Sequence, residues 1–289
     1  MQYLAKGKRS IVYTISYKGK LAAIKQQRKD SSANNVVERE FEILKKLNKH
    51  SIGPKAYALS SGLIMELLKG PTIEEYITKA SRASILIMLS KVLKKLRKLD
   101  SLGYSKQEMT NPYKHIIITK KGPRLLDFER CRFTRSPSNV TQFLNYLYKK
   151  KMQLAAKGIF ILDKKLRPLA ARYKRKLGKN SFKPIFDEVM QKGFAARVYF
   201  EVSKIPQGRV SSYKAIAEKL GSRAYRAIGQ ALNKNPFWPI VPCHRILASD
   251  GSLGGFARGE QEKLRLLKAE GVSIENQKII KTHRKNSLD

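Results

Sequence analysis

The first 25 residues constrain the fold most, because apolar and polar side chains alternate along them. The alternation breaks at Gly7 and again at Lys18-Gly19-Lys20, where turn-forming residues replace the pattern. A period of two places the apolar side chains on one face of an extended strand. The pattern therefore predicts three antiparallel strands at the start of the chain.

Later segments change to the helical period. Between 34 and 48, Val37, Phe41, Leu44 and Leu47 recur at helical spacing, and a Gly-Pro pair then ends the pattern. Two short strands at 55–59 and 62–67 would complete a sheet. Further elements are expected as a helix at 85–96, a hairpin at 116–119 and 124–127, and helices at 139–152, 194–202, 212–220 and 223–233. The fold class that follows is α+β with more than one domain.

Charge sets the class of partner. The chain has 60 Lys and Arg against 22 Asp and Glu, a net charge of +38 over 289 residues, and 42% of its residues are hydrophobic. This composition supports packed cores and a polyanionic partner, either nucleic acid or an anionic membrane surface. The longest purely apolar run, 85–89, is too short to span a bilayer. We expect an intracellular, cytoplasmic monomer that does not bind membranes.

The basic stretch PLAARYKRKLGKNSFKP predicts the domain boundary. It shows little periodicity and is rich in Lys and Arg, which is typical of a linker. We expect a first domain at 1–167, a basic linker at 168–184, a second domain at 185–275 and a solvated basic tail at 276–289.

Cys243 is the candidate nucleophile. It lies between Pro242 and His244, next to Arg245, and these neighbours would stiffen the backbone and favour a thiolate. The alternative is a small buried side chain, which is the usual state of a single cysteine. With only two cysteines and four histidines, neither a disulfide framework nor a structural zinc site is implied.

Four segments, IPQGRVSSY, RAIGQALNKNP, PIVPCHRI and GSLGGF, resemble methylated-DNA–protein-cysteine methyltransferases in order and spacing. The resemblance covers about 185–275. It implies a mainly helical domain with a helix-turn-helix that enters the minor groove. It also implies transfer of an alkyl group from O6 of guanine in double-stranded DNA to the protein's cysteine, without a cofactor.

The resemblance assigns roles to the residues around that cysteine. Cys243 would be the alkyl acceptor, and His244 would be its base, acting through a water molecule. Glu270 would orient the histidine, and Asn235 would brace the cysteine turn by hydrogen bonds.

The resemblance also implies residues that contact DNA. Tyr213 would donate a hydrogen bond to the guanine ring, Arg226 would fill the gap left by the extruded base, and Phe256 would stack. Segment 222–233 would be the recognition helix. Its small residues would allow a close approach to DNA: Ala224, Ala227 and Gly229.

The N-terminal segment LAKGKRSIVYTISYKGKLAAIKQQR resembles the glycine-rich loop, here with the single Gly7, and the third strand of a protein kinase. Lys25 stands where a lysine binds nucleotide phosphates, and Glu40 would be its ion-pair partner. Asp127 in LLDFER would be the Mg²⁺ ligand, with Glu129 where glycine is usual. Over about 1–155 the chain resembles small RIO-like and lipopolysaccharide kinases of archaea, which implies ATP and Mg²⁺ as ligands.

The expected catalytic loop departs from the kinase pattern. A usual loop has His-x-Asp followed five residues later by Asn. This chain has YSKQEMTNPYKHIII, in which Glu108 and His115 stand seven apart. We place both at the predicted nucleotide site, and we expect ATP binding rather than rapid phosphoryl transfer.

Three functions remain in competition at this point. The first is a DNA-repair alkyltransferase fused to a kinase-like domain, and PCHR favours it. The second is a module that recognises lesions and recruits other factors. The third is an ATP-binding serine/threonine kinase that its C-terminal domain targets to DNA.

Overall fold

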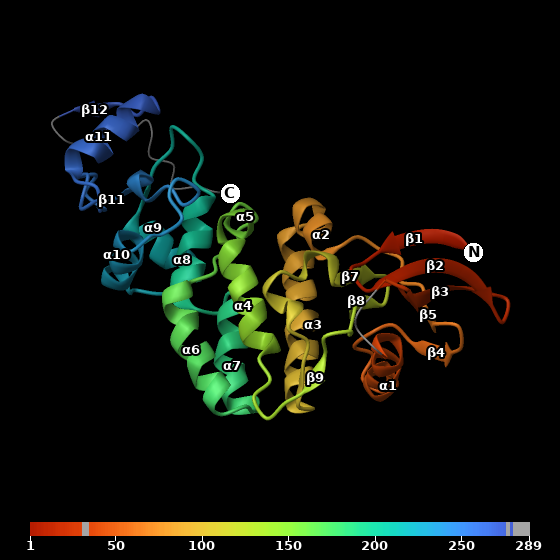
Figure 1. Ribbon diagram of the computed structural model, residues 1–289. Coiled ribbons are helices and arrows are strands. Elements are labelled where there is room, and N and C mark those ends of the chain that lie inside the picture. The colour runs from red at the N-terminus through yellow and green to blue at the C-terminus, as the bar shows by residue number, and fades with distance from the viewer. Residues whose placement is uncertain (31–34, 276–277, 280–289) are drawn as a thin grey trace. The chain divides into compact units, whose positions relative to one another are not determined.

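The structure of the chain is a computed structural model, and it describes residues 1–30, 35–275 and 278–279 (Figure 1). It divides into two compact units. The first unit consists of 1–149 and 164–186, and the second consists of 150–163 and the described residues from 187 onward. The α+β class predicted from the sequence is confirmed.

The first unit begins with a five-stranded antiparallel sheet in the order β1-β2-β3-β5-β4. Its strands are β1 (Gln2–Lys6), β2 (Ser10–Tyr17), β3 (Lys20–Gln27), β4 (Ala56–Leu59) and β5 (Leu63–Glu66). The three strands expected at the N-terminus and the two short strands after the first helix are therefore confirmed. Lys18 and Gly19, both with positive φ, form the turn between β2 and β3.

Helix α1 (Val36–Asn48) packs beside this sheet (Figure 1). Val37, Leu44 and Leu47 are buried at helical spacing, as the sequence predicts. Glu40 lies on the same inward face and is only 1% exposed. The apolar face therefore delivers a carboxylate into the interior, where it needs a cationic partner.

The rest of the first unit is mainly helical. Its elements are α2 (Ile73–Lys79), α3 (Arg82–Ser101), β6 (Tyr104–Ser105), short 3-10 helices at Glu108–Thr110 and Pro112–Lys114, β7 (Ile116–Thr119), β8 (Gly122–Leu125), β9 (Arg132–Phe133) and α4 (Asn139–Lys149). β7 pairs with β8 and β6 with β9, both antiparallel. The expected helix at 85–96 and the expected hairpin at 116–127 are confirmed.

A buried hydrogen-bond network at Asp100 joins the helices of this unit. The carboxylate accepts from the backbone N–H of Asn139 at 2.9 Å, from that of Val140 at 3.1 Å and from the hydroxyl of Tyr173 at 3.0 Å. The Asn139 side chain in turn accepts from the backbone N–H of Lys106 at 2.8 Å. The network thereby fixes the backbone of Lys106, which lies at the polar cluster described below.

Most of the basic stretch at 168–184 is helical, with a break at 176–178, where an irregular linker was expected. It lies in α6 (Asp163–Arg175) and α7 (Lys179–Val189), which bury Tyr173 and Phe182 in the first unit while most of the Lys and Arg side chains stay exposed. The few apolar anchors are widely spaced among the cations, and this spacing hides the helical period in the sequence.

The two compact units divide the chain at other positions than the expected domain boundaries. Segment 150–163, expected in the first domain, belongs to the second unit, and 164–186 belongs to the first. The chain therefore passes between the units more than once, which a linear division of the sequence does not foresee. The predicted basic tail at 276–289 lies outside the described residues except for 278–279. In the described residues, no helix has the length and apolarity needed to cross a membrane.

The second unit is mainly helical. Its elements are α5 (Lys151–Ala155), α8 (Phe194–Ser203), β10 (Ser211–Ser212), α9 (Tyr213–Lys219), α10 (Tyr225–Asn233), a 3-10 helix at Cys243–Arg245, β11 (Ile246–Leu247), α11 (Glu260–Ala269), β12 (Ile274–Glu275) and β13 (Lys278–Ile279). Phe160, Tyr199 and Phe237 meet edge to face at the centre of its core, with ring centroids 5.2–5.8 Å apart. This core supports α8, α9 and α10.

Candidate functional site

Cys243 begins a 3-10 turn between α10 and β11 and is half-buried. The side-chain amide of Asn235 donates to its Sγ at 3.4 Å and to the carbonyl of Val241 at 2.8 Å. The Asn235 oxygen accepts from the backbone N–H of Phe237 at 2.9 Å. One amide thus holds the chain segment that leads into the cysteine, and the structure brings Asn235 and Cys243 together.

Glu270, just after α11, contacts two residues of the cysteine segment. Its Oε1 lies 3.0 Å from Nε2 of His244, and the Arg245 guanidinium donates to both carboxylate oxygens at 2.7 and 2.8 Å. Burial alone would raise the pKa of Glu270, but hydrogen bonds from Arg245 and His244 outweigh it and lower the pKa to about 2. The carboxylate is therefore ionised at neutral pH. Arg245, expected to act on the thiol, is instead bound to Glu270.

His244 is buried, with a relative exposure of 4%. Burial lowers the pKa of this imidazole, and the Glu270 carboxylate counteracts the effect only in part. The ring is thus neutral at pH 7. Because an ionised carboxylate only accepts, the hydrogen lies on Nε2 and the lone pair lies on Nδ1. Nδ1 is buried and has no hydrogen-bond partner among the described residues.

A pocket of about 310 Å³ opens beside Cys243. Its volume is at the lower end of the range for small-molecule sites. Three residues assigned to base recognition or close approach line it together with the cysteine, so the structure brings them together. The lining consists of Tyr213, Gly229, Leu232, Asn233, Cys243, Gly255, Phe256 and Ala257.

A second hollow, of about 610 Å³, lies against the N-terminal part of α10. Arg226 and Tyr225 line it, and both are exposed. Tyr213 and Gly229 line this hollow and the cysteine pocket alike. Ala224 is also exposed, and Ala227 is half-buried on the same helix. The expected recognition helix therefore presents a cation beside the entrance to the pocket.

Lys263 is a residue of this unit that the sequence analysis missed. It is fully buried in α11, and its ammonium donates to the carbonyls of Ile246 and Leu253. Burial lowers its pKa to about 8. The lysine ties β11, which follows the cysteine turn, to the loop that leads to Phe256. Its partners are backbone carbonyls 10 and 17 residues away along the chain, so the sequence around Lys263 does not predict its burial.

Comparisons with known proteins agree on this part of the chain. The family described as "6-O-methylguanine DNA methyltransferase, DNA binding domain" matches residues 193–272. Residues 193–272 are an alkyltransferase DNA-binding domain. A methylated-DNA--protein-cysteine methyltransferase of Sulfolobus acidocaldarius is 54% identical over 82 residues, which are 28% of this chain and 52% of the relative. One of Saccharolobus solfataricus is 51% identical over 81 residues, with the same shares.

Solved structures also match a part of the chain of similar length. The Mycobacterium tuberculosis OGT in complex with DNA is 41% identical, with 27% of this chain and 48% of that chain covered and a TM-score of 0.26. The S. pombe Atl1 in complex with DNA containing O6-carboxymethylguanine is 33% identical, with 30% and 89% covered and a TM-score of 0.28. The chain spans about half the length of the curated relatives it matches.

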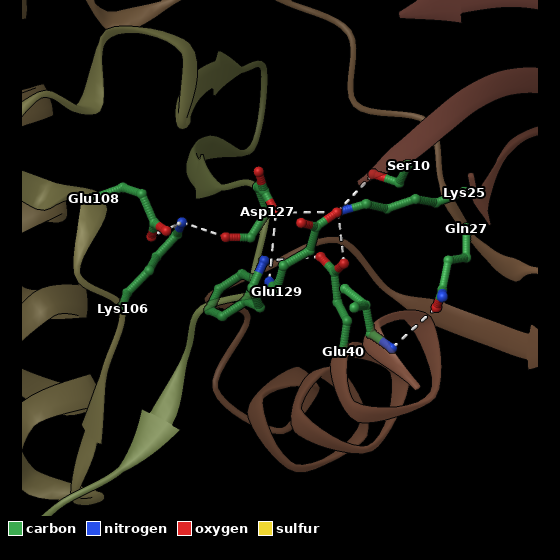
Figure 2. Close-up of polar contacts among 10 residues, drawn as sticks. Ser10, Lys25, Gln27, Glu40, Lys106, Glu108, Asp127 and Glu129 are labelled. Carbon is green, nitrogen blue, oxygen red and sulfur yellow. Dashed lines mark hydrogen bonds and ion pairs between the residues drawn. The ribbon is translucent and has the colours of Figure 1, made fainter. Parts of the chain in front are cut away.

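A second polar cluster lies in the first unit, outside the matched region (Figure 2). The Lys25 ammonium on β3 lies 2.6 Å from Oε2 of Glu40, 3.1 Å from Oδ1 of Asp127 and 2.9 Å from Oε1 of Glu129. Lys25 is 4% exposed. Burial alone would lower the pKa of this lysine, but the three carboxylates outweigh it and raise the pKa, so the ammonium is charged. The structure therefore brings Lys25, Glu40 and Asp127 together, as the sequence predicts.

Lys106 joins this cluster to Glu108 and was missed by the sequence analysis. Its buried ammonium lies 3.2 Å from Oε2 of Glu108 and donates to the backbone carbonyl of Asp127 (Figure 2). The only sequence signal is a lysine two residues before Glu108. The buried cation thus fixes the predicted catalytic loop against the predicted metal-binding segment.

His115 and Gly7, the other two residues predicted at the nucleotide site, make none of the hydrogen bonds or ion pairs described above for the polar cluster. His115 is half-buried, and burial lowers its pKa to about 4, so the ring is neutral. Gly7 lies in the turn between β1 and β2, where its backbone N–H donates to the carbonyl of Ser10 at 2.8 Å. It is exposed and stands at the edge of the sheet. Both positions stay predictions.

We expect Glu270 to make the stability of the second unit sensitive to acid. A carboxylate with a lowered pKa in the folded state stabilises the fold above its unfolded pKa, and this contribution is lost as pH falls. Here it is complete above about pH 4.5 and disappears as pH falls through about 2. The shift corresponds to at most about 3 kcal/mol. The chain's single tryptophan, Trp238, reports on this unit by its fluorescence during denaturant unfolding.

Glu270→Gln should therefore flatten the pH dependence of that free energy of unfolding between pH 4.5 and 2. Glu262→Gln is the matched control, because Glu262 is a half-buried glutamate on the same helix, α11, that pairs only with the exposed Arg265 in the described contacts. The control should behave like the unaltered protein. An unchanged acid dependence in Glu270→Gln would show that its ion pairs do not stabilise the unit.

Proposed function

We propose that the chain repairs DNA by accepting an alkyl group from O6 of alkylguanine on Cys243, once per molecule. One observation carries the proposal. Cys243 lines a pocket with Tyr213 and Phe256, and the residue next to it, His244, is held by Glu270 in the tautomer that leaves Nδ1 free to accept a proton. The family match over 193–272 and the methylated-DNA--protein-cysteine methyltransferase names of the relatives support it.

The chemistry proceeds as a single displacement. The lone pair on Nδ1 of His244 draws the thiol proton of Cys243 through a water molecule, and Glu270 stabilises the imidazolium that forms. The thiolate attacks the alkyl carbon, so an S–C bond forms while the C–O6 bond breaks. The electron pair goes to the guanine, and the proton returns to it, so guanine departs neutral. The thioether has no good leaving group, and Cys243 therefore does not regenerate.

The pocket residues would hold the extruded guanine. The hydroxyl of Tyr213 would donate to the ring, and burial raises its pKa, which keeps the hydroxyl protonated at neutral pH. Phe256 offers an aromatic face, and its ring lies 6.4 Å from that of His244. Asn235 keeps the cysteine turn in place. These contacts would orient the O6-alkyl group toward Sγ of Cys243. Holding the alkyl carbon close to the sulfur raises the rate of transfer.

The double-stranded DNA would lie against α10. Arg226 is exposed beside the pocket entrance and would occupy the gap left by the flipped base. The small side chains at Ala224, Ala227 and Gly229 would let the helix approach the minor groove closely. The net charge of +38 favours binding to the phosphate backbone of DNA, and this contribution does not depend on the base sequence of the DNA.

We predict that one methyl group is transferred to Cys243 from duplex DNA containing labelled O6-methylguanine. Mass spectrometry of the digested protein should place one label per molecule on that cysteine, and Cys243→Ser should abolish it. Cys131→Ser is the matched control, because Cys131 is buried and its pKa is raised to about 12 by burial. Binding of lesion DNA without any transfer would instead favour the recruitment module.

We predict that Arg226→Ala slows repair in duplex DNA far more than it slows the reaction with the free base O6-benzylguanine. Extrusion costs a few kcal/mol, and only the duplex reaction bears this cost. Single-turnover rates with both substrates measure the split. Arg223→Ala, an exposed arginine just before α10, controls for the loss of one positive charge. Equal slowing with both substrates would contradict the role in extrusion.

A second candidate function belongs to the first unit: we infer that it binds ATP with Mg²⁺. The observation that favours it is the buried ion pair of Lys25 and Glu40 beside Asp127. A lysine so placed can bind phosphate oxygens, and an aspartate can hold the metal ion. The residues fit these ligands, and Glu108, held by Lys106, is the available base for a substrate hydroxyl.

We predict that MgATP binds the full chain and that Lys25→Ala weakens this binding by about tenfold or more, since a charge-assisted contact is lost. Isothermal titration calorimetry measures the affinity. Lys20→Ala, at an exposed position on the same strand, is the control. Binding that is equal in parent and Lys25→Ala would refute this site.

A further inference from the structure

Glu129 has an arrangement that the nucleotide-binding proposal does not explain. Its Oε1 accepts from the hydroxyl of Ser10 at 2.6 Å and lies 2.9 Å from the ammonium of Lys25 (Figure 2). Its side chain is only 11% exposed. One carboxylate oxygen therefore joins the first residue of β2 to the central lysine of β3.

The two donors that Glu129 engages are the kind that bind phosphate. A hydroxyl and an ammonium that converge on one oxygen suit a phosphate oxygen as well as a carboxylate oxygen. In this structure both donors converge on the glutamate. An incoming phosphate must therefore displace the Glu129 carboxylate before it can use them.

Charge acts in the same direction. Three carboxylates surround the one ammonium of Lys25, so the immediate neighbourhood of that ammonium carries a surplus of negative charge. A nucleoside triphosphate is itself strongly negative, and Glu129 adds repulsion at the point where its phosphates would arrive. Loss of Glu129 would remove both the competing contact and that repulsion.

The backbone near Glu129 is fixed, so its side chain must make the movement. The carbonyl of Asp127 accepts from Lys106, and the backbone N–H of Phe128 donates to Oε1 of Glu40 at 2.8 Å. These contacts hold the two residues that precede Glu129. The glutamate can leave Lys25 by rotating about its side-chain bonds, without refolding of the segment.

We propose that Glu129 is an internal competitor for nucleotide phosphate, which occupies the Ser10 and Lys25 donors and lowers the affinity of the first unit for MgATP. The inference rests on the nucleotide binding proposed above and specifies how it is controlled. The apparent affinity equals the intrinsic affinity multiplied by the fraction of molecules in which Glu129 has left the site. A high concentration of nucleotide is thus needed to displace the Glu129 carboxylate from Ser10 and Lys25.

Calorimetric titration of the full chain tests this with three ligands: MgATP, magnesium tripolyphosphate and adenosine. Glu129→Gln keeps the shape of the side chain but removes its charge, and we expect it to bind MgATP and tripolyphosphate about tenfold or more tightly than the parent. Adenosine, which has no phosphate, should show no gain. Glu129→Asp keeps the charge on a shorter stem that cannot span both donors, and it should give a smaller gain.

Glu38→Gln is the matched control, because it removes one exposed negative charge from α1 of the same unit. It should leave all three affinities unchanged. Equal MgATP affinity in the parent and both Glu129 variants would overturn the competitor role alone. Weaker binding by Glu129→Gln would make Glu129 a ligand of the bound nucleotide and would also overturn it. Absence of MgATP binding in the parent and in both variants would refute the nucleotide site itself.

Discussion

The Glu270 carboxylate is the contact on which the cysteine site depends. It comes from the end of α11 and binds His244 and Arg245 of the cysteine turn, and it lies 3.4 Å from the backbone N–H of Gly208. Three segments far apart in the sequence therefore meet at one charge. A buried carboxylate is stable only with such partners. The same partners keep it ionised, and its ionisation sets the tautomer of His244.

The polar cluster of the first unit has the opposite balance of charge. At the cysteine site one carboxylate meets a guanidinium and an imidazole, whereas at Lys25 one ammonium meets three carboxylates. The first arrangement holds a neutral base ready for proton transfer. In the second, the Lys25 ammonium is already paired with carboxylates of the protein, and an anionic ligand has to compete with those carboxylates. This difference explains why we assign chemistry to the first site and regulated binding to the second.

Local patterns in the sequence predicted the local structure well. The alternation over the first 25 residues and the helical spacing around Leu44 appear as strands and a helix. Asn235, Cys243 and His244 could be proposed as site residues because each lies within a short contiguous motif. Lys106 and Lys263 could not, since their partners are carbonyls and carboxylates brought near only by the fold. The helices α6 and α7 were missed because few apolar anchors stand among many cations.

The central claim is that Glu270 makes His244 a base for Cys243, and one measurement tests it most directly. The single-turnover rate with O6-benzylguanine at pH 7 compares the parent with Glu270→Gln, and Glu262→Gln serves as control. The free base excludes effects of DNA binding and extrusion. We predict that Glu270→Gln reacts about a hundredfold more slowly while folded, since a positioned base contributes on that order. A rate equal to that of the parent would contradict the account.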